Sequence, residues 1–113
     1  MKIKVWKEKF TIVKSKQEMP YAFASIHDRK EITVIINENK IVVNSVIKSE
    51  KDFKLISFKE VLPFKLTGFI AKISKSLADE KIPIFVISSF STDHILVKEK
   101  YIEKAVKCLE RLK

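Results

Sequence analysis

The chain of 113 residues contains a single glycine, Gly68, and this limits both the folds it can adopt and the ligands it can hold. A P-loop needs two glycines and a dinucleotide-binding turn needs three, because the backbone must approach the phosphates closely. The serine nucleophile elbow G-x-S-x-G is excluded for the same reason. We therefore expect neither a nucleotide-binding fold nor a serine hydrolase, and the sequence indicates no cofactor.

Gly68 follows Thr67 at the point where a strand-like run gives way to a helical pattern. The first turn of a helix offers unpaired N–H groups and positive partial charge, and a residue without Cβ lets a small carboxylate approach them. Close packing of a helix against a sheet would favour the same residue without any ligand. The residue pattern leaves both interpretations open.

The composition is that of one globular domain or of two small intertwined halves. Apolar residues make up 46% of the chain and charged residues 33%, and no apolar run approaches the ~18 residues of a membrane span. The first residues lack a secretion signal, and the single cysteine, Cys108, cannot form an internal disulfide. We expect a cytoplasmic protein without a membrane segment. His27, His94 and Cys108 are too scattered to predict a metal site.

The net charge is +9, but only Arg29 and Arg111 among the 23 basic residues are arginine, the residue that grips phosphate in a fork. Lysines are densest in residues 1–16, where Trp6 and Phe10 lie between them. This interleaving suits a nucleic-acid backbone, but a solvated amphipathic strand has the same pattern. We expect the strand, and nucleic acid is not the expected partner.

The first half of the chain is predicted to consist of strands. Ile3 and Val5, and then Phe10 and Ile12, alternate with polar residues. The runs 32–36 and 41–47 are rich in β-branched residues. Asn, Glu and Asn at 37–39 predict a hairpin turn between these two runs. A further strand is expected over 53–58.

The second half reads as strand, helix, strand, strand and helix. Apolar residues recur at helical spacing from Gly68 to Leu77, which predicts an amphipathic helix capped by Thr67 and prevented from continuing by Pro83. The last helix is expected to turn one apolar face inward, formed by Ile102, Ala105, Val106, Leu109 and Leu112.

Two strands are predicted between these helices. Residues 82–90 are nearly all apolar up to Ser88 and predict a strand buried on both faces. A turn over 88–93 leads to a second strand over 94–97. This order is most of a ferredoxin-like α+β unit, an antiparallel sheet with helices on one face. The missing strand can come from the first half, which gives two intertwined half-units over 1–53 and 54–113.

A resemblance to ACT domains rests on residues 62–109, LPFKLTGFIAKISKSLADEKIPIFVISSFSTDHILVKEKYIEKAVKCL. Its most specific parts are the L-T-G-F turn, the I-P-I-F-V-I-S-S-F strand and the S-T-D-H-I-L-V return. The stretch is similar to small stand-alone bacterial and archaeal ACT proteins related to the animal cytosolic arginine sensors. The first half resembles the divergent N-terminal unit of that family more weakly.

The resemblance implies a non-catalytic regulatory domain that binds an amino acid or similar small metabolite and works in pairs, as a homodimer. By position, the implied ligand-binding residues are Thr67, Gly68 and Phe69 at the helix start, Ser89 and Phe90 at the strand end, and Asp93 in the next turn. Backbone N–H groups after Thr67 would hold the carboxylate, Ser89 the amine, Phe90 the stem and Asp93 a cationic head.

Two lysines depart from the family pattern. Lys65 stands where the family usually has glycine or another small residue, and Lys81 and Ile82 lie in a turn where the family usually has glycine. Lys65 would either repel a cationic ligand or bind a second carboxylate, so the resemblance does not identify the ligand as arginine. The alternative is a ligand-free interaction module that binds nucleic acid or an acidic protein through its lysines.

Overall fold

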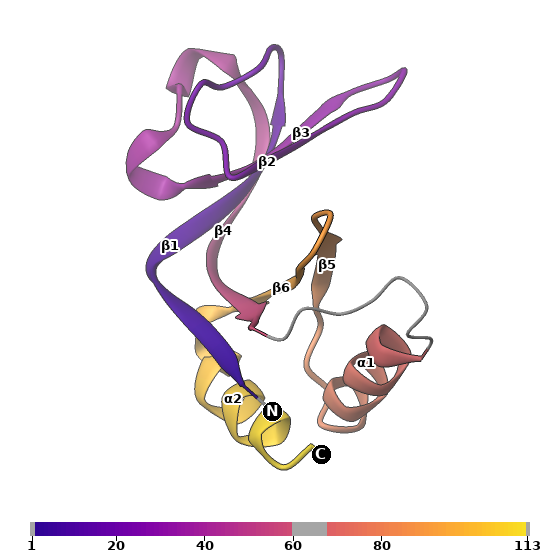
Figure 1. Ribbon diagram of the computed structural model, residues 1–113. Helices are drawn as coiled ribbons and strands as arrows, with labels where there is room; N and C mark the ends of the chain where they lie inside the picture. The colour runs from indigo at the N-terminus through magenta and orange to yellow at the C-terminus, as the bar shows by residue number, and fades with distance from the viewer. Residues whose placement is uncertain (1, 60–67, 113) are drawn as a thin grey trace. The chain divides into compact units, whose positions relative to one another are not determined.

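The computed structural model describes residues 2–59 and 68–112 (Figure 1). The elements are β1 (Ile3–Ser15), β2 (Ala24–His27), β3 (Ile32–Asn37), β4 (Val46–Phe58), α1 (Phe69–Asp79), β5 (Phe85–Ser88), β6 (Asp93–Lys98) and α2 (Ile102–Glu110), with short 3-10 helices η1 (Glu38–Lys40), η2 (Val43–Ser45) and η3 (Glu99–Tyr101). The strands form one antiparallel sheet in the order β2-β3-β1-β4-β6-β5. The predicted α+β fold is confirmed. In the described ranges, no helix is long and apolar enough to span a bilayer.

The chain divides into two compact units. Residues 1–7 and 54–113 form one, here called the helical unit, and residues 8–53 form the other, the strand unit. The chain passes from one unit to the other inside β1 and again inside β4, each a strand of 13 residues. The N-terminal strand therefore supplies the fourth strand of the helical unit, as the ferredoxin-like pattern predicts.

The core of the helical unit lies between its sheet and both helices, which Figure 1 draws in red (α1) and yellow (α2). α1 contributes Ile73 and Leu77, and α2 contributes Ala105, Cys108 and Leu109. The strands meet them with Ile56, Phe58, Ile95 and Val97, which share one face of the sheet because side chains alternate along a strand. The helical spacing of the apolar residues thus builds the predicted single helix-covered face.

The strand unit has its own small core of Val13, Met19, Val34 and Ile36. The predicted strand over 41–47 is wrong for most of its length, because Val43 lies in η2 with 77% of its surface exposed. The predicted 37–39 hairpin is also wrong. A turn does form there, with the Asn37 side chain accepting the backbone N–H of Asn39, but β3 and β4 lie on opposite sides of β1.

The strand predicted over 82–90 is present but shorter, as β5, and the prediction that both its faces are buried is wrong. β5 is the last strand of the sheet order, and none of its four residues is buried. An apolar run alone does not distinguish a central strand from an edge strand, because that depends on which strands pair.

Candidate functional site

Gly68 adopts a left-handed conformation at the start of α1. It is the N-cap residue, with φ 81° and ψ −1°, and its carbonyl accepts the Lys72 N–H at 2.9 Å. The N-cap position belongs to Gly68, which has no side chain to bond to the first turn, and not to Thr67 as the sequence predicted. Thr67 itself lies outside the described residues.

The backbone explains the glycine better than close packing does. A Cβ placed on Gly68 would meet no atom within 4 Å in the part of the chain that the structure describes. The left-handed conformation is the one that glycine adopts without the steric penalty that a Cβ brings. Among the described residues, therefore, the N-cap residue offers no side chain to the first N–H groups of α1, and no atom fills the space beside Gly68.

The Phe69 side chain points into the core. Its ring contacts the Phe58 ring edge to face, with centroids 5.3 Å apart, and it packs against the helical unit's core. Of the predicted roles at the helix start, Phe69 can therefore supply its backbone N–H but not its side chain.

The β5–β6 hairpin brings several predicted residues together by hydrogen bonds. Ser89 donates its backbone N–H to the Thr92 carbonyl at 2.8 Å and its hydroxyl to the same oxygen at 3.1 Å. The Ser88 hydroxyl donates to the Asp93 carboxylate. Phe90, at the tip, is 83% exposed. Ser89, Phe90 and Asp93 thus share one turn, while Gly68 and Phe69 belong to a second group at the start of α1.

A partly buried series of hydrogen bonds joins the strands β1, β4 and β6. Trp6 on β1 donates its Nε1–H to the Ser57 hydroxyl at 2.8 Å, and that hydroxyl is 2.7 Å from Nδ1 of His94. β1, β4 and β6 are successive strands of the sheet. These hydrogen bonds join β6 to β4, and through Ser57 to β1, one residue after Asp93.

Burial lowers the pKa of His94 below its ordinary value, and the negative charge of neighbouring Asp93 opposes this in part. The neutral imidazole is therefore favoured in the folded state. The direction of the Ser57–His94 bond follows the tautomer: the hydroxyl donates when Nδ1 carries no proton and accepts when it does.

The sequence analysis did not predict the hydrogen bonds that join Trp6, Ser57 and His94. The available signal was a single polar residue within an apolar run, Ser57 among Leu55, Ile56 and Phe58.

Cys108 is buried, with 8% of its surface exposed. Its thiol donates to the Ser76 carbonyl across the helix pair, with the sulfur 3.4 Å from that oxygen, and burial raises its pKa. Because the thiolate is the reactive form, this thiol is a packing residue.

Solved structures that resemble this one show the same fold. A protein of unknown function from Vibrio cholerae, described as a possible transport protein, gives a TM-score of 0.81 at 18% identity, over 95% of this chain and 85% of that one. A protein from Agrobacterium tumefaciens gives a TM-score of 0.81 at 20% identity, over 96% of this chain and 85% of that one. The ligand-free regulatory subunit of aspartate kinase from Thermus thermophilus gives a TM-score of 0.71 at 11% identity, over 96% of this chain and 94% of that one.

No curated protein matches the sequence. The ACT domain family matches it over residues 48–111, more than half of its length and including the start of α1, the β5–β6 hairpin and α2. With the ferredoxin-like arrangement of the helical unit, this match establishes the family. The chain belongs to the ACT domain family.

Proposed function

We propose that this chain is a non-catalytic, cytoplasmic regulatory module that binds an amino acid or a similar small metabolite. The proposed ligand residues are Thr67, Gly68, Phe69, Ser89, Phe90 and Asp93. The left-handed Gly68 carries the proposal, because it begins α1 without a side-chain cap and with open space beside it in the described part of the chain. The likeness to a regulatory subunit of aspartate kinase supports a regulatory role.

The chemistry of the two groups suits the two ends of an amino acid. A carboxylate accepts hydrogen bonds from the first N–H groups of α1, where the helix dipole is positive. The Ser89 hydroxyl gives its proton to Thr92, so its oxygen lone pairs are available to an ammonium group. The Asp93 carboxylate adds negative charge, and the exposed Phe90 ring offers an apolar cover for the side chain of the ligand.

Calorimetric titration with each of the twenty amino acids tests the proposal. We expect saturable heat with one or a few of them. Gly68→Asn is the informative variant, because asparagine tolerates the left-handed conformation while its side chain can occupy the first-turn N–H groups. It should fold like the parent and bind at least about tenfold more weakly, the loss expected for one hydrogen bond to a charged group.

A matched control comes from the same hairpin. Ser91→Ala lies between the proposed residues Phe90 and Asp93 and should bind like the parent, whereas Ser89→Ala and Asp93→Asn should bind more weakly. If no amino acid gives saturable heat at millimolar concentration, the proposal loses its ligand. Equal binding by parent and Gly68→Asn would remove the start of α1 from the site.

One observation favours the alternative of an interaction module for nucleic acid. Residues 1–7 and 54–59 contain five lysines and no acidic residue, and the backbone N–H of Lys59 donates to the Lys2 carbonyl, which brings the two segments together. Binding through such a cluster weakens steeply with added salt, whereas an amino-acid site responds little. Titrating a single-stranded oligonucleotide while following Trp6 fluorescence at several salt concentrations separates the two functions.

A further inference from the structure

The N-terminal half of β1 has a free backbone edge. β3 pairs with β1 from Phe10 to Ser15, and in the described part of the chain the strand order puts no other strand next to β1 on that side. Residues 3–7 of β1 are therefore paired with β4 alone. An unpaired strand edge presents N–H and C=O groups that another strand can bind.

A hydrogen bond just beyond the two strands gives the register of β1 with β4 in the helical unit. The Lys59 N–H donates to the Lys2 carbonyl, so these two residues form a bonded pair, and Ile3 with Phe58 form the next, unbonded pair. Ile3 and Phe58 both belong to the core of the helical unit, as residues opposite one another should. Counting on, Val5 is also in an unbonded pair. The N–H and C=O of Ile3 and Val5 therefore point away from β4, toward the free edge.

One face of this edge is basic. Because Ile3 packs against the core beneath the helices, Lys2, Lys4 and Trp6 lie on the opposite face of the sheet. Nζ of Lys4 is 3.9 Å from the centroid of the Trp6 ring, and both lysines are exposed. A strand placed beside β1 would meet these charges on one of its two faces.

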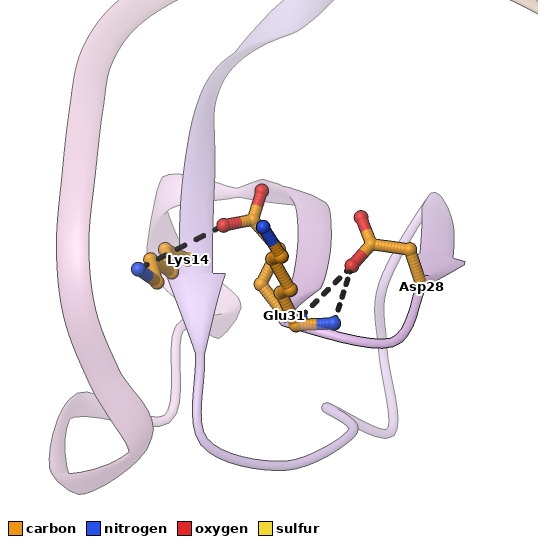
Figure 2. Close-up of polar contacts among 4 residues, drawn as sticks. Lys14, Asp28 and Glu31 are labelled. Carbon is orange, nitrogen blue, oxygen red and sulfur yellow. Dashed lines mark hydrogen bonds and ion pairs between the residues drawn. The ribbon is translucent and has the colours of Figure 1, made fainter.

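Elsewhere on β1 a lysine has an acidic partner within the chain. In the strand unit, Nζ of Lys14 lies 3.7 Å from the Glu31 carboxylate, and Figure 2 shows Glu31 in a turn where its backbone N–H donates to the Asp28 carboxylate at 3.0 Å. In the helical unit, residues 1–7 and 54–59 contain five lysines and no acidic residue. Among the described residues, none of these five lysines has a salt bridge. Their charge is available to an acidic partner.

α2 lies over the β1 side of the sheet. α1 connects β4 to β5 and so crosses over β6, which lies between them, and this leaves the part of the face over β4 and β1 to α2. The Cys108 thiol bonds to the Ser76 carbonyl of α1, so this side of α2 faces α1. Ile102 and Val106 lie about 120° and 160° around the helix from Cys108, on the flank that turns toward the free edge.

An open, mostly apolar groove runs along this flank. It is lined by Ile102, Glu103, Val106, Lys107 and Glu110. A strand added to the free edge would direct alternate side chains toward this groove and the others toward Lys2 and Lys4, because side chains alternate along a strand. The two glutamates of the groove disfavour acidic side chains on the groove side. The surface therefore fits a strand that is apolar on one face and acidic on the other.

We propose that the free edge of β1 binds an extended segment of a partner protein in which apolar and acidic residues alternate. The segment adds a strand that bonds to the backbone of Ile3 and Val5. Its apolar side chains lie against the α2 groove, and its acidic side chains lie near Lys2 and Lys4. A second copy of this chain fits less well, because it would bring three more lysines to the same edge. A nucleic acid would use the lysines but neither the backbone edge nor the groove.

Backbone amide exchange measured by NMR tests the added strand. The probe is a blocked heptapeptide of alternating glutamate and valine, which can pair in either direction. We expect saturating peptide to slow exchange of the Val5 N–H at least about tenfold, because that group gains a hydrogen bond. The N–H groups of Lys4 and Trp6 bond to β4 in this register and should change little. A single-stranded oligonucleotide should leave Val5 exchange unchanged.

Calorimetric titration with the same peptide tests the three parts of the surface. Val5→Pro removes an outward N–H and leaves the bonds to β4 intact. Val106→Gln takes apolar surface from the groove without adding charge, and Lys4→Glu reverses a charge on the basic face. Binding should weaken about tenfold in Val5→Pro and Lys4→Glu and about fivefold in Val106→Gln. Lys48→Glu, an exposed lysine of β4 in the strand unit, makes the same charge change elsewhere and should bind like the parent.

Peptide binding without slower exchange at Val5 would overturn the proposal, and so would the absence of saturable heat with this peptide. Equal binding of a peptide with lysine in place of glutamate would do the same, as would unchanged binding by any of the three surface variants or an equal loss in Lys48→Glu. None of these measurements uses an amino acid or a residue proposed to hold one, so they stand whether or not the proposed ligand binds.

Discussion

Lys81, just after the C-terminal end of α1, has a backbone conformation that is unfavourable for a residue with a side chain. It has φ 60°, in the left-handed region where a Cβ costs about 1–2 kcal/mol. Its N–H donates to the Ala78 carbonyl and the Ile82 N–H to the Leu77 carbonyl, which is the Schellman arrangement that usually has glycine at this place. The ACT resemblance also expects a glycine in this turn.

Lys81→Gly should therefore raise the free energy of unfolding by about 1 kcal/mol, the strain that the Cβ imposes less the entropy of a more flexible unfolded chain. Urea unfolding measures it. Lys81→Ala keeps the Cβ and should show no comparable gain. A glycine variant no more stable than the alanine variant would mean that the turn is not strained.

Ser57 is the second residue whose removal has a specific consequence. Ser57→Ala removes the hydroxyl that bonds both to the Trp6 N–H and to Nδ1 of His94. The loss of a partner by a buried polar group lowers the free energy of unfolding by about 1–3 kcal/mol. We expect urea unfolding to show that loss and the fluorescence of Trp6, the only tryptophan, to shift. Ser25→Ala, an exposed strand serine, should change stability little. Equal stability of the two variants would contradict the role of Ser57.

Among the elements, α1 is the one that its sequence predicts most completely. Its apolar spacing placed Ile73 and Leu77 inward, and both are fully buried. Leu77→Ala should destabilise the protein by about 2–5 kcal/mol, as large-to-small core changes do. Lys75 lies on the opposite face with Nζ 3.0 Å from the Asp79 carboxylate, and both side chains are exposed, so Lys75→Ala should cost at most about 0.5 kcal/mol. Thermal unfolding of both variants gives the comparison, and similar losses would mean that the helix is not packed as described.

For β5, in contrast to α1, the sequence predicted the element but not its burial. Its residues predict a strand, and a strand forms, but its exposure depends on the order in which strands pair. Residues 41–47 differ again: their β-branched composition predicts a strand, yet no partner strand buries Val43, and a 3-10 turn forms instead. Strand propensity expresses the fit of a side chain to a half-buried surface, so it fails where that surface is missing.

For the whole molecule, His94 links stability to pH. Its pKa in the folded state is lowered from 6.5, so below that pH the unfolded chain binds more protons than the folded one. The contribution of His94 to stability is therefore complete above about pH 6.5 and decreases as the pH falls toward the folded-state pKa. Urea unfolding between about pH 7.5 and pH 5 should show a steeper loss for the parent than for His94→Gln. Parallel curves for the two proteins would contradict this assignment.

The periodic patterns of the chain established much of its fold before any coordinates. They predicted α1, α2, β1, β3 and β6, the ferredoxin-like order of the second half, and the glycine at the start of a helix. These features are local, because a helix face or an alternating strand is written in neighbouring residues. The ACT resemblance added the candidate ligand residues, which the patterns alone did not identify.

Only the tertiary structure shows the contacts between residues that lie far apart in the sequence. Ser57 lies 51 residues from Trp6 and 37 from His94, and no local pattern pairs them. The exposure of β5 and the separation of β3 from β4 by β1 likewise follow from the order of the strands in the sheet. Local periodicity specifies which face of an element is apolar, but only the assembled sheet specifies what, if anything, covers that face.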